Sequence, residues 1–211
     1  MTNIEKAVAL VTCFTNGDKK TASSLLKENY IQHNLAYGTG RDAFLGSVEY
    51  LGSAPVKTTF KNIRAFEDGD KVVLQSVYNF AGTKDQVAFD VFRFEDGLIA
   101  EHWDNLANVA PANPSGHTQI DGDTNITPNE NTEKTREIVK NFLNDVMKGE
   151  HPEKTPEYFD GNNYIQHNSG IADGLKELGD ALASLAEQGI QMIYDKVHFV
   201  LACGDYALGI S

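Results

Sequence analysis

The sequence has only two cysteines, Cys13 and Cys203, and neither lies at the spacing of a metal-binding or redox motif. We therefore predict two reduced, buried thiols and no disulfide scaffold. No apolar run approaches the roughly 18 residues that a membrane-spanning helix needs. The N-terminal residues lack the charged start and the cleavage site of a signal peptide, which favours a soluble, cytoplasmic protein.

Basic residues are also scarce. The chain carries 18 Lys and Arg against 30 Asp and Glu, a formal net charge of −12. Because phosphate groups and anionic lipids are bound by clustered Lys and Arg, this balance argues against nucleic acid or a membrane surface as a partner. The sequence has no glycine-rich phosphate loop, nucleophile elbow or thiol dyad, so we expect no cofactor.

What the sequence does contain is a repeated hexapeptide. NYIQHN occurs at Asn29–Asn34 and again at Asn163–Asn168, 134 positions later. That separation is about the length of a small domain, so the repeat predicts a tandem duplication. We assign a first domain to 1–109, a linker rich in Pro, Asn, Gly and Asp to 110–131, and a second domain to 132–211.

Helical and strand patterns within the first copy predict an α+β domain. Apolar residues recur at helical spacing and give way, after Pro55, to Val, Phe, Thr and Tyr broken by turn signals. We expect helices over 3–15, 19–30 and 41–52, followed by antiparallel strands over 57–67, 71–82, 85–95 and 98–106.

The second copy restarts the pattern and then stops. We expect helices over 132–149 and 173–189, with Asp173 as the N-cap of the latter, and a strand hairpin within 192–211. Counterparts of the last two strands are missing, which leaves an incomplete sheet with unpaired edges. Three explanations are open: another chain supplies the missing strands, the first copy's sheet covers the gap, or the sequence is truncated. We favour truncation.

Ionisable residues gather on the final hairpin of the first copy. A three-residue turn at Glu95–Gly97 would pair Phe94 with Leu98. One strand face would then carry Asp90, Phe92, Ala100, His102 and Asp104, and the other Val91, Arg93, Glu101 and Trp103. A two-residue turn would slip the register and take Asp90 off the first face. An Asp and a His two residues apart, with another Asp across the ladder, suit general acid–base catalysis.

The order of helices, the YIQHN segment and the ending DVFRFEDGLIAEHWDN resemble the SnoaL-like polyketide cyclase family, within the nuclear transport factor two-like superfamily. The resemblance covers 1–109, and 131–211 as far as the second copy extends. It implies tandem cone-shaped barrels, each with three helices against a curved antiparallel sheet, the second incomplete. It also implies an apolar pocket and dimerisation through the outer sheet face, as a homodimer or an intramolecular pseudo-dimer.

The resemblance also assigns roles. The family's aspartate, which moves a proton alpha to a carbonyl, matches Asp104 in the motif HWD. His102 and His33 would bind or polarise the carbonyl oxygen, and Asp90 would complete the site. His33 recurs as His167 in a copy without HWD, which favours a structural role for this histidine instead.

The predicted function is cofactor-free proton transfer, in aldol-type cyclisation or isomerisation, on a small apolar carbonyl compound held against Phe92 and Tyr30. The alternative is a non-catalytic ligand-binding or dimerisation module, favoured by the incomplete second copy. His33, His102 and Asp104 could in principle form a metal triad, but the sequence favours no metal.

Overall fold

The computed structural model describes residues 1–190 and 192–211. The chain divides into two compact units, Met1–Val109 and Ala110–Ser211. Each unit has its own β-sheet, and together the units give the chain an α+β architecture. Among the helices of the described residues, none combines the length and apolar character needed to cross a membrane.

The first unit is built on a five-stranded sheet. Its strands are β1 (Leu26–Gln32), β2 (Thr59–Asp68), β3 (Lys71–Asn79), β4 (Asp85–Glu95) and β5 (Leu98–Asn108). They lie in the order β1-β5-β4-β3-β2, with β2 to β5 antiparallel and β1 parallel to β5. The four predicted strands are confirmed. The sheet is mixed, however, so the prediction of a wholly antiparallel sheet was wrong.

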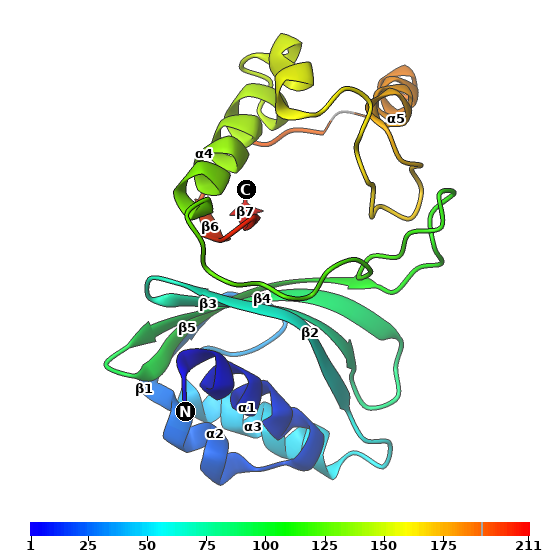
Figure 1. The fold of residues 1–211 in the computed structure, drawn as a ribbon. Coiled ribbons are helices and arrows are strands. Elements are labelled where there is room, and N and C mark those ends of the chain that lie inside the picture. Colours follow the sequence, from blue (N-terminus) through cyan, green and yellow to red (C-terminus); the bar gives the residue numbers. More distant parts are fainter. Residues whose placement is uncertain (191) are drawn as a thin grey trace. The chain divides into compact units, whose positions relative to one another are not determined.

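Three helices cover one face of this sheet (Figure 1): α1 (Asn3–Asn16), α2 (Lys19–Leu25) and α3 (Arg41–Ser53). In α1, the side chain of Thr2 accepts a hydrogen bond from the backbone N of Glu5, whose carboxylate accepts one from Thr2 N. This capping box and the left-handed Gly17 after the last turn define the ends of the helix.

The predicted helix over 19–30 is wrong in its second half, which forms β1. Leu26 and Tyr30 in this strand are each only 1% exposed. Gln32 at its end pairs with His102 on β5. Pairing with β5 satisfies the hydrogen-bonding groups of the β1 backbone. Because β5 is distant in the sequence, the local periodicity of 19–30 does not reveal this pairing.

The turn between β4 and β5 also differs from the prediction. Glu95 lies opposite Leu98, so the turn contains two residues, Asp96 and Gly97. Both have positive φ, 54° and 77°. Asp-Gly is a preferred pair for the type I′ turn, whose twist matches that of the flanking strands. The predicted three-residue turn is therefore wrong.

A β-bulge beside the turn nevertheless restores the predicted strand face. The register shifts between Arg93 and Phe94, because Phe94 pairs with Ile99 while Arg93 pairs with Glu101. Ala100 is thus the extra residue of the bulge. Beyond it, Phe92 lies opposite His102 and Asp90 lies opposite Asp104. All four share one face of the sheet, since residues directly opposite each other point to the same side.

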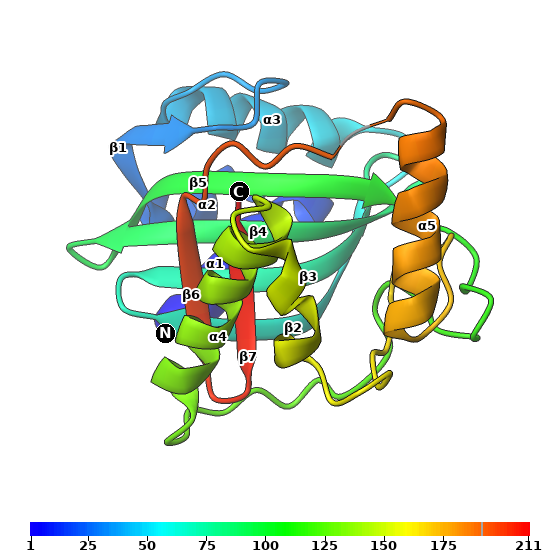
Figure 2. The ribbon, with the colours of Figure 1, turned by 90° about the horizontal axis from the view of Figure 1, so that it is seen from above.

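The second unit has a smaller sheet. Its elements are α4 (Thr132–Phe142), a π-helical turn η1 (Leu143–Met147), a 3₁₀ helix η2 (Pro152–Tyr158), α5 (Leu175–Glu187), β6 (Phe199–Cys203) and β7 (Tyr206–Ile210). β6 and β7 form an antiparallel hairpin against which α4 packs (Figure 2). The predicted final hairpin is confirmed. A second cone of three helices on a curved sheet is not seen among the described residues of this unit.

Two local predictions for the second unit need correction. Gly174, and not Asp173, is the N-cap of α5, because Asp173 Oδ1 instead accepts a hydrogen bond from the backbone N of Gln166. In the predicted linker, Asn113 is buried and its side-chain N donates to the carbonyl oxygens of Gln166 and Ile171. The segment around Asn113 is therefore packed against the second hexapeptide.

The two hexapeptides have the same local hydrogen bonding. Several bonds recur at the repeat separation. Among them are Gly40 N to Tyr30 O and Gly174 N to Tyr164 O, Asn34 N to Gln32 Oε1 and Asn168 N to Gln166 Oε1, and Ala36 N to Asn34 Oδ1 and Gly170 N to Asn168 Oδ1. The equal spacing in sequence is therefore matched by equivalent hydrogen bonds, although the first hexapeptide begins within β1 and residues 164–168 of the second form no strand.

Candidate active site

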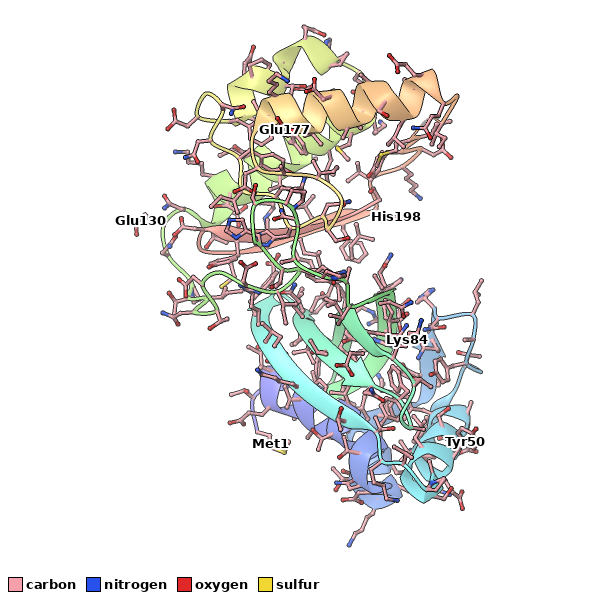
Figure 3. All side chains as sticks on the ribbon, turned by 90° about the vertical axis from the view of Figure 1, so that its right-hand side faces the viewer. Met1, Tyr50, Lys84, Glu130, Glu177 and His198 are labelled. Carbon is pink, nitrogen blue, oxygen red and sulfur yellow. The ribbon has the colours of Figure 1, made fainter. Side chains whose placement is uncertain are left out.

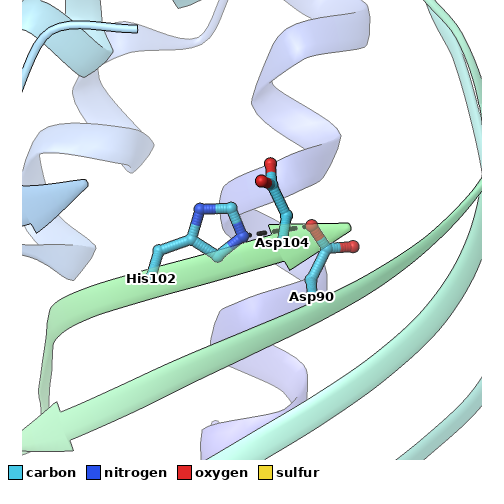
Figure 4. A group of neighbouring side chains, drawn as sticks. All are labelled: Asp90, His102 and Asp104. Atoms are coloured by element: carbon cyan, nitrogen blue, oxygen red, sulfur yellow. Dashed lines mark hydrogen bonds and ion pairs between the residues drawn. The ribbon is translucent and has the colours of Figure 1, made fainter. Parts of the chain in front are cut away.

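Asp90, His102 and Asp104 converge on the inner face of the sheet (Figure 4). One side-chain N or O atom from each lies within 4.8 Å of the others. Nε2 of His102 is 3.1 Å from Oδ1 of Asp90, and both residues are buried, with 6% and 4% of their surface exposed. These three ligand atoms are close enough to hold one metal ion.

The hydrogen bonds of Gln32 determine the tautomer of His102. The side-chain oxygen of Gln32 accepts from the backbone N of Asn34 at 3.1 Å, which fixes the orientation of the amide group. The same oxygen lies 3.1 Å from Nδ1 of His102, so Nδ1 must carry a proton. Nε2 then faces Asp90, and a hydrogen bond between them requires that the two groups share one further proton.

Neutral donors hold the two carboxylates. The hydroxyl of Tyr78 donates to Oδ2 of Asp90 at 2.8 Å, and the side-chain N of Asn34 donates to Oδ2 of Asp104 at 2.9 Å. Burial, reinforced by the charge of Asp90, raises the pKa of Tyr78 well above its usual range. Tyr78 therefore keeps its proton and remains a donor.

The cluster opens onto a cavity of about 40 Å³ lined by the sheet and by residues of α1 and α3. Apolar and aromatic side chains form most of the wall, among them Val11, Phe14, Phe44, Phe80 and Leu106. Among the described residues that line it, none is a lysine or an arginine. Charge in this cavity is therefore controlled by the two aspartates and the histidine alone, in surroundings that strengthen their mutual interaction.

The predicted pocket residues take different positions. Phe92 lines the cavity and stacks on His102, with ring centroids 4.4 Å apart. Tyr30 lies behind Gln32, and its hydroxyl accepts a hydrogen bond from the amide N of Gln32 at 3.1 Å. Burial raises the pKa of Tyr30, so it too stays protonated. Tyr30 therefore supports Gln32 and does not form part of the cavity wall.

His33 does not join the cluster. Its ring stacks on Trp103, and its Nε2 lies 2.7 Å from Oε1 of Glu101. Glu101 and Trp103 flank His102 in β5, so their side chains lie on the face of the sheet opposite to His102. Burial raises the pKa of Glu101, but the hydrogen bonds from His33 and Arg93 outweigh burial and hold it below its usual range. His33 is thus part of an ion-paired group outside the cavity, and the metal triad that included it does not form.

Sequence reasoning missed Gln32, Asn34 and Tyr78. The first two flank His33 in the repeated hexapeptide, and side chains in an extended segment alternate between faces. If His33 faces outward, its neighbours on either side face the site. The alternation was therefore the signal that could have identified Gln32 and Asn34; Tyr78 had no comparable signal.

Several solved structures are similar to about half of this chain. They include a nuclear transport factor two-like protein of unknown function from Cytophaga hutchinsonii, with 18% identity, a TM-score of 0.45, and coverage of 51% of this chain and 91% of that one. Another is a candidate polyketide cyclase, IdmH from Streptomyces antibioticus, with 20% identity, a TM-score of 0.41, and coverage of 50% and 92%. A third is an epoxide hydrolase from M. tuberculosis, with 18% identity, a TM-score of 0.43, and coverage of 49% and 81%.

No curated protein matches the chain. The model of the SnoaL-like domain family matches residues 7–102, a span that contains the whole of α1 to β4 except the first turn of α1, and β5 as far as His102. Residues 7–102 therefore match the SnoaL-like domain family, in agreement with the sequence resemblance.

Proposed function

We propose that the first unit catalyses proton transfer at the carbon alpha to the carbonyl of a small, apolar, uncharged compound, as in an aldol-type cyclisation or an isomerisation. The observation that carries this proposal is that Asp104 and the Asp90–His102 pair face one mostly apolar cavity. A catalyst of this kind needs a base for the alpha proton and a proton donor for the carbonyl oxygen. The cluster supplies both.

Asp104 is the proposed base. Its carboxylate takes the alpha proton as the C–H bond breaks, and Asn34 keeps it oriented. The electron pair of that bond forms the C=C bond of an enol, and the π electrons of the carbonyl move onto its oxygen, which receives the proton shared by His102 and Asp90. Phe92 stacks on the imidazole ring of His102. No added cofactor is required for this step, because the proton is gained and lost by side chains already present.

Exchange of the alpha hydrogens of acetone in D₂O, followed by ¹H NMR, tests the proposal. Replacing the base by Asp104→Asn should slow the exchange about 10²- to 10⁴-fold. Asp96→Asn is the matched control, because it makes the same chemical change at an exposed turn residue whose left-handed backbone Asn tolerates. Equal rates for wild type and Asp104→Asn would remove Asp104 from the mechanism.

A second candidate function, ligand binding without catalysis, is favoured by the size of the cavity. Its volume of about 40 Å³ is far below the ~300 Å³ of an ordinary ligand pocket. Saturable binding of a ketone, with hydrogen exchange at the buffer rate, would support this second function over the first.

We also propose that the chain arose by internal duplication and that only its first unit is catalytic. The repeated hexapeptide and its matching hydrogen bonds support the duplication. The second unit offers no equivalent of the HWD motif in its described residues. The 1–109 fragment, expressed alone, should therefore retain the exchange activity. A cytoplasmic location and a homodimer or pseudo-dimer remain proposals; light scattering after size-exclusion chromatography distinguishes the assemblies.

A further inference from the structure

A second hollow lies on the outer side of α3, next to the catalytic cavity. Its volume is about 280 Å³, and its walls are Tyr37, Ala43, Gly46, Ser47, Tyr50 and Leu51. Tyr50, labelled in Figure 3, is 73% exposed and marks its outer side. Tyr37 and Ser47 also line the catalytic cavity. The two spaces are therefore neighbours that share part of one wall.

The catalytic cavity by itself is too small for a ring-bearing substrate. A cavity needs about 10–15 Å³ to hold one water molecule. The catalytic cavity, at about 40 Å³, therefore admits a group of only a few heavy atoms. A carbonyl and one attached methyl group fit that limit. Any larger part of a substrate must lie outside, and the hollow on α3 is the adjoining space.

The walls of the hollow favour a flat, uncharged group. All six lining residues are uncharged, and two are tyrosines. The hydroxyl of Ser47 donates to the carbonyl oxygen of Ala43, so it does not require a polar partner from a ligand. Burial, together with the charge of Asp104, raises the pKa of Tyr37. Tyr37 is thus a neutral phenol at the boundary between the hollow and the catalytic group.

Small residues in α3 create the hollow. Ala43, Gly46 and Ser47 are spaced so that they lie on one side of the helix. A Cβ added at Gly46 would meet no other atom within 4 Å. Because a Cβ at this position meets open space and Gly46 lines the hollow, Gly46 is the position at which a larger side chain can close it.

We propose that the binding site has two compartments, in which the catalytic cavity takes a small carbonyl head and the α3 hollow takes the flat apolar tail of the same molecule. This inference rests on the proposed function. It names the substrate class as an uncharged ketone with an aromatic or polycyclic tail. Tyr37 and Ser47 line both compartments.

The test measures binding of 2-acetylnaphthalene by ligand-observed NMR, which does not depend on catalysis. Gly46→Leu should weaken binding at least about tenfold, because the leucine occupies the space of the naphthalene ring. Gly179→Leu is the matched control: Gly179 lies inside α5, and a Cβ there also meets nothing within 4 Å. It should bind like wild type.

Tyr50→Ala provides a second variant in case Gly46→Leu lowers the stability of the fold, which circular dichroism would reveal. It removes one wall and should weaken binding about threefold or more. Unchanged binding in both folded variants would overturn the two-compartment site, even if acetone exchange is catalysed. If the variants bind more weakly but wild type exchanges hydrogen only at the buffer rate, the two-compartment site is supported and the proposed catalysis is contradicted.

Discussion

The side-chain oxygen of Gln32 lies 3.1 Å from Nδ1 of His102 and also accepts a hydrogen bond from the backbone of Asn34. The hexapeptide loop thus determines which nitrogen of the imidazole faces Asp90. A residue that touches no reacting atom in the proposed mechanism therefore positions the proton that the mechanism uses.

Gln32→Leu should release this control. Without the acceptor, His102 would populate both neutral tautomers, and the exchange rate should fall about 10- to 100-fold, the equivalent of an oriented hydrogen bond worth about 1.5–3 kcal/mol. Long-range ¹⁵N–¹H NMR of the imidazole reports the tautomer directly. Gln32→Glu keeps an acceptor and should preserve the wild-type tautomer. Identical imidazole spectra for Gln32→Leu and wild type would show that Gln32 has no such role.

Tyr78→Phe should cost stability as well as activity. The change removes the donor to Oδ2 of Asp90, in a buried site, and leaves that oxygen without its hydroxyl partner. We expect a loss of about 1–3 kcal/mol in the free energy of unfolding. Fluorescence of Trp103, the single tryptophan, follows unfolding of the first unit in urea. A midpoint equal to that of wild type would contradict the assigned hydrogen bond.

Two glycines of α3 should respond in opposite directions to alanine. A Cβ at Gly52 would lie 2.8 Å from the backbone N of Gly17 and still closer to its Cα, so Gly52→Ala should destabilise the first unit by about 1–3 kcal/mol. Gly46→Ala meets nothing and should stabilise it by about 0.5–1 kcal/mol, since alanine is the better helix former. The same fluorescence measurement decides both, and a stabilising Gly52→Ala would contradict the close packing of α1 on α3.

The second unit should lose stability as the pH rises above 6.5 and passes the raised pKa of His117. His117 contacts Asp121 at 2.8 Å and Asp173 at 3.2 Å, and His167 also contacts Asp121. The hydrogen bond with Asp121 is the main reason that the pKa of His117 is raised above 6.5. A raised pKa stabilises the fold fully below the unfolded value, and that stabilisation disappears as the pH passes the folded value.

NMR titration of the His117 ring tests this prediction. Its pKa should lie above 6.5 in wild type and fall in Asp121→Asn, together with the pH dependence of hydrogen-exchange protection in 113–121. His151→Gln, which removes an exposed histidine paired with Glu153, should change neither quantity. An ordinary His117 pKa in wild type would refute the assignment.

Local patterns predicted the first unit well where local chemistry determines it. Thr2, Glu5 and Gly17 define α1 by short-range hydrogen bonds and backbone conformation, and these are readable in sequence. The parallel pairing of β1 with β5 is not, because it depends on residues about 70 positions apart.

The prediction that Asp90, His102 and Asp104 share one strand face was reached through two errors that cancel. The two-residue turn alone would have moved Asp90 away from His102, and the bulge at Ala100 moved it back. Ile99 and Ala100 are both buried, so the alternation that reveals strand faces is interrupted where the bulge occurs. The sequence pattern could therefore predict which residues share a face of the sheet, but not the register in which β4 pairs with β5.

A crystal structure with 2-acetylnaphthalene bound tests the inward-facing acid–base cluster most directly. The methyl carbon should lie beside the carboxylate of Asp104, with the ketone oxygen toward Nε2 of His102 and the ring in the hollow beside Gly46. A ligand bound elsewhere at saturating concentration, or Asp104 turned away from the cavity, would contradict the account.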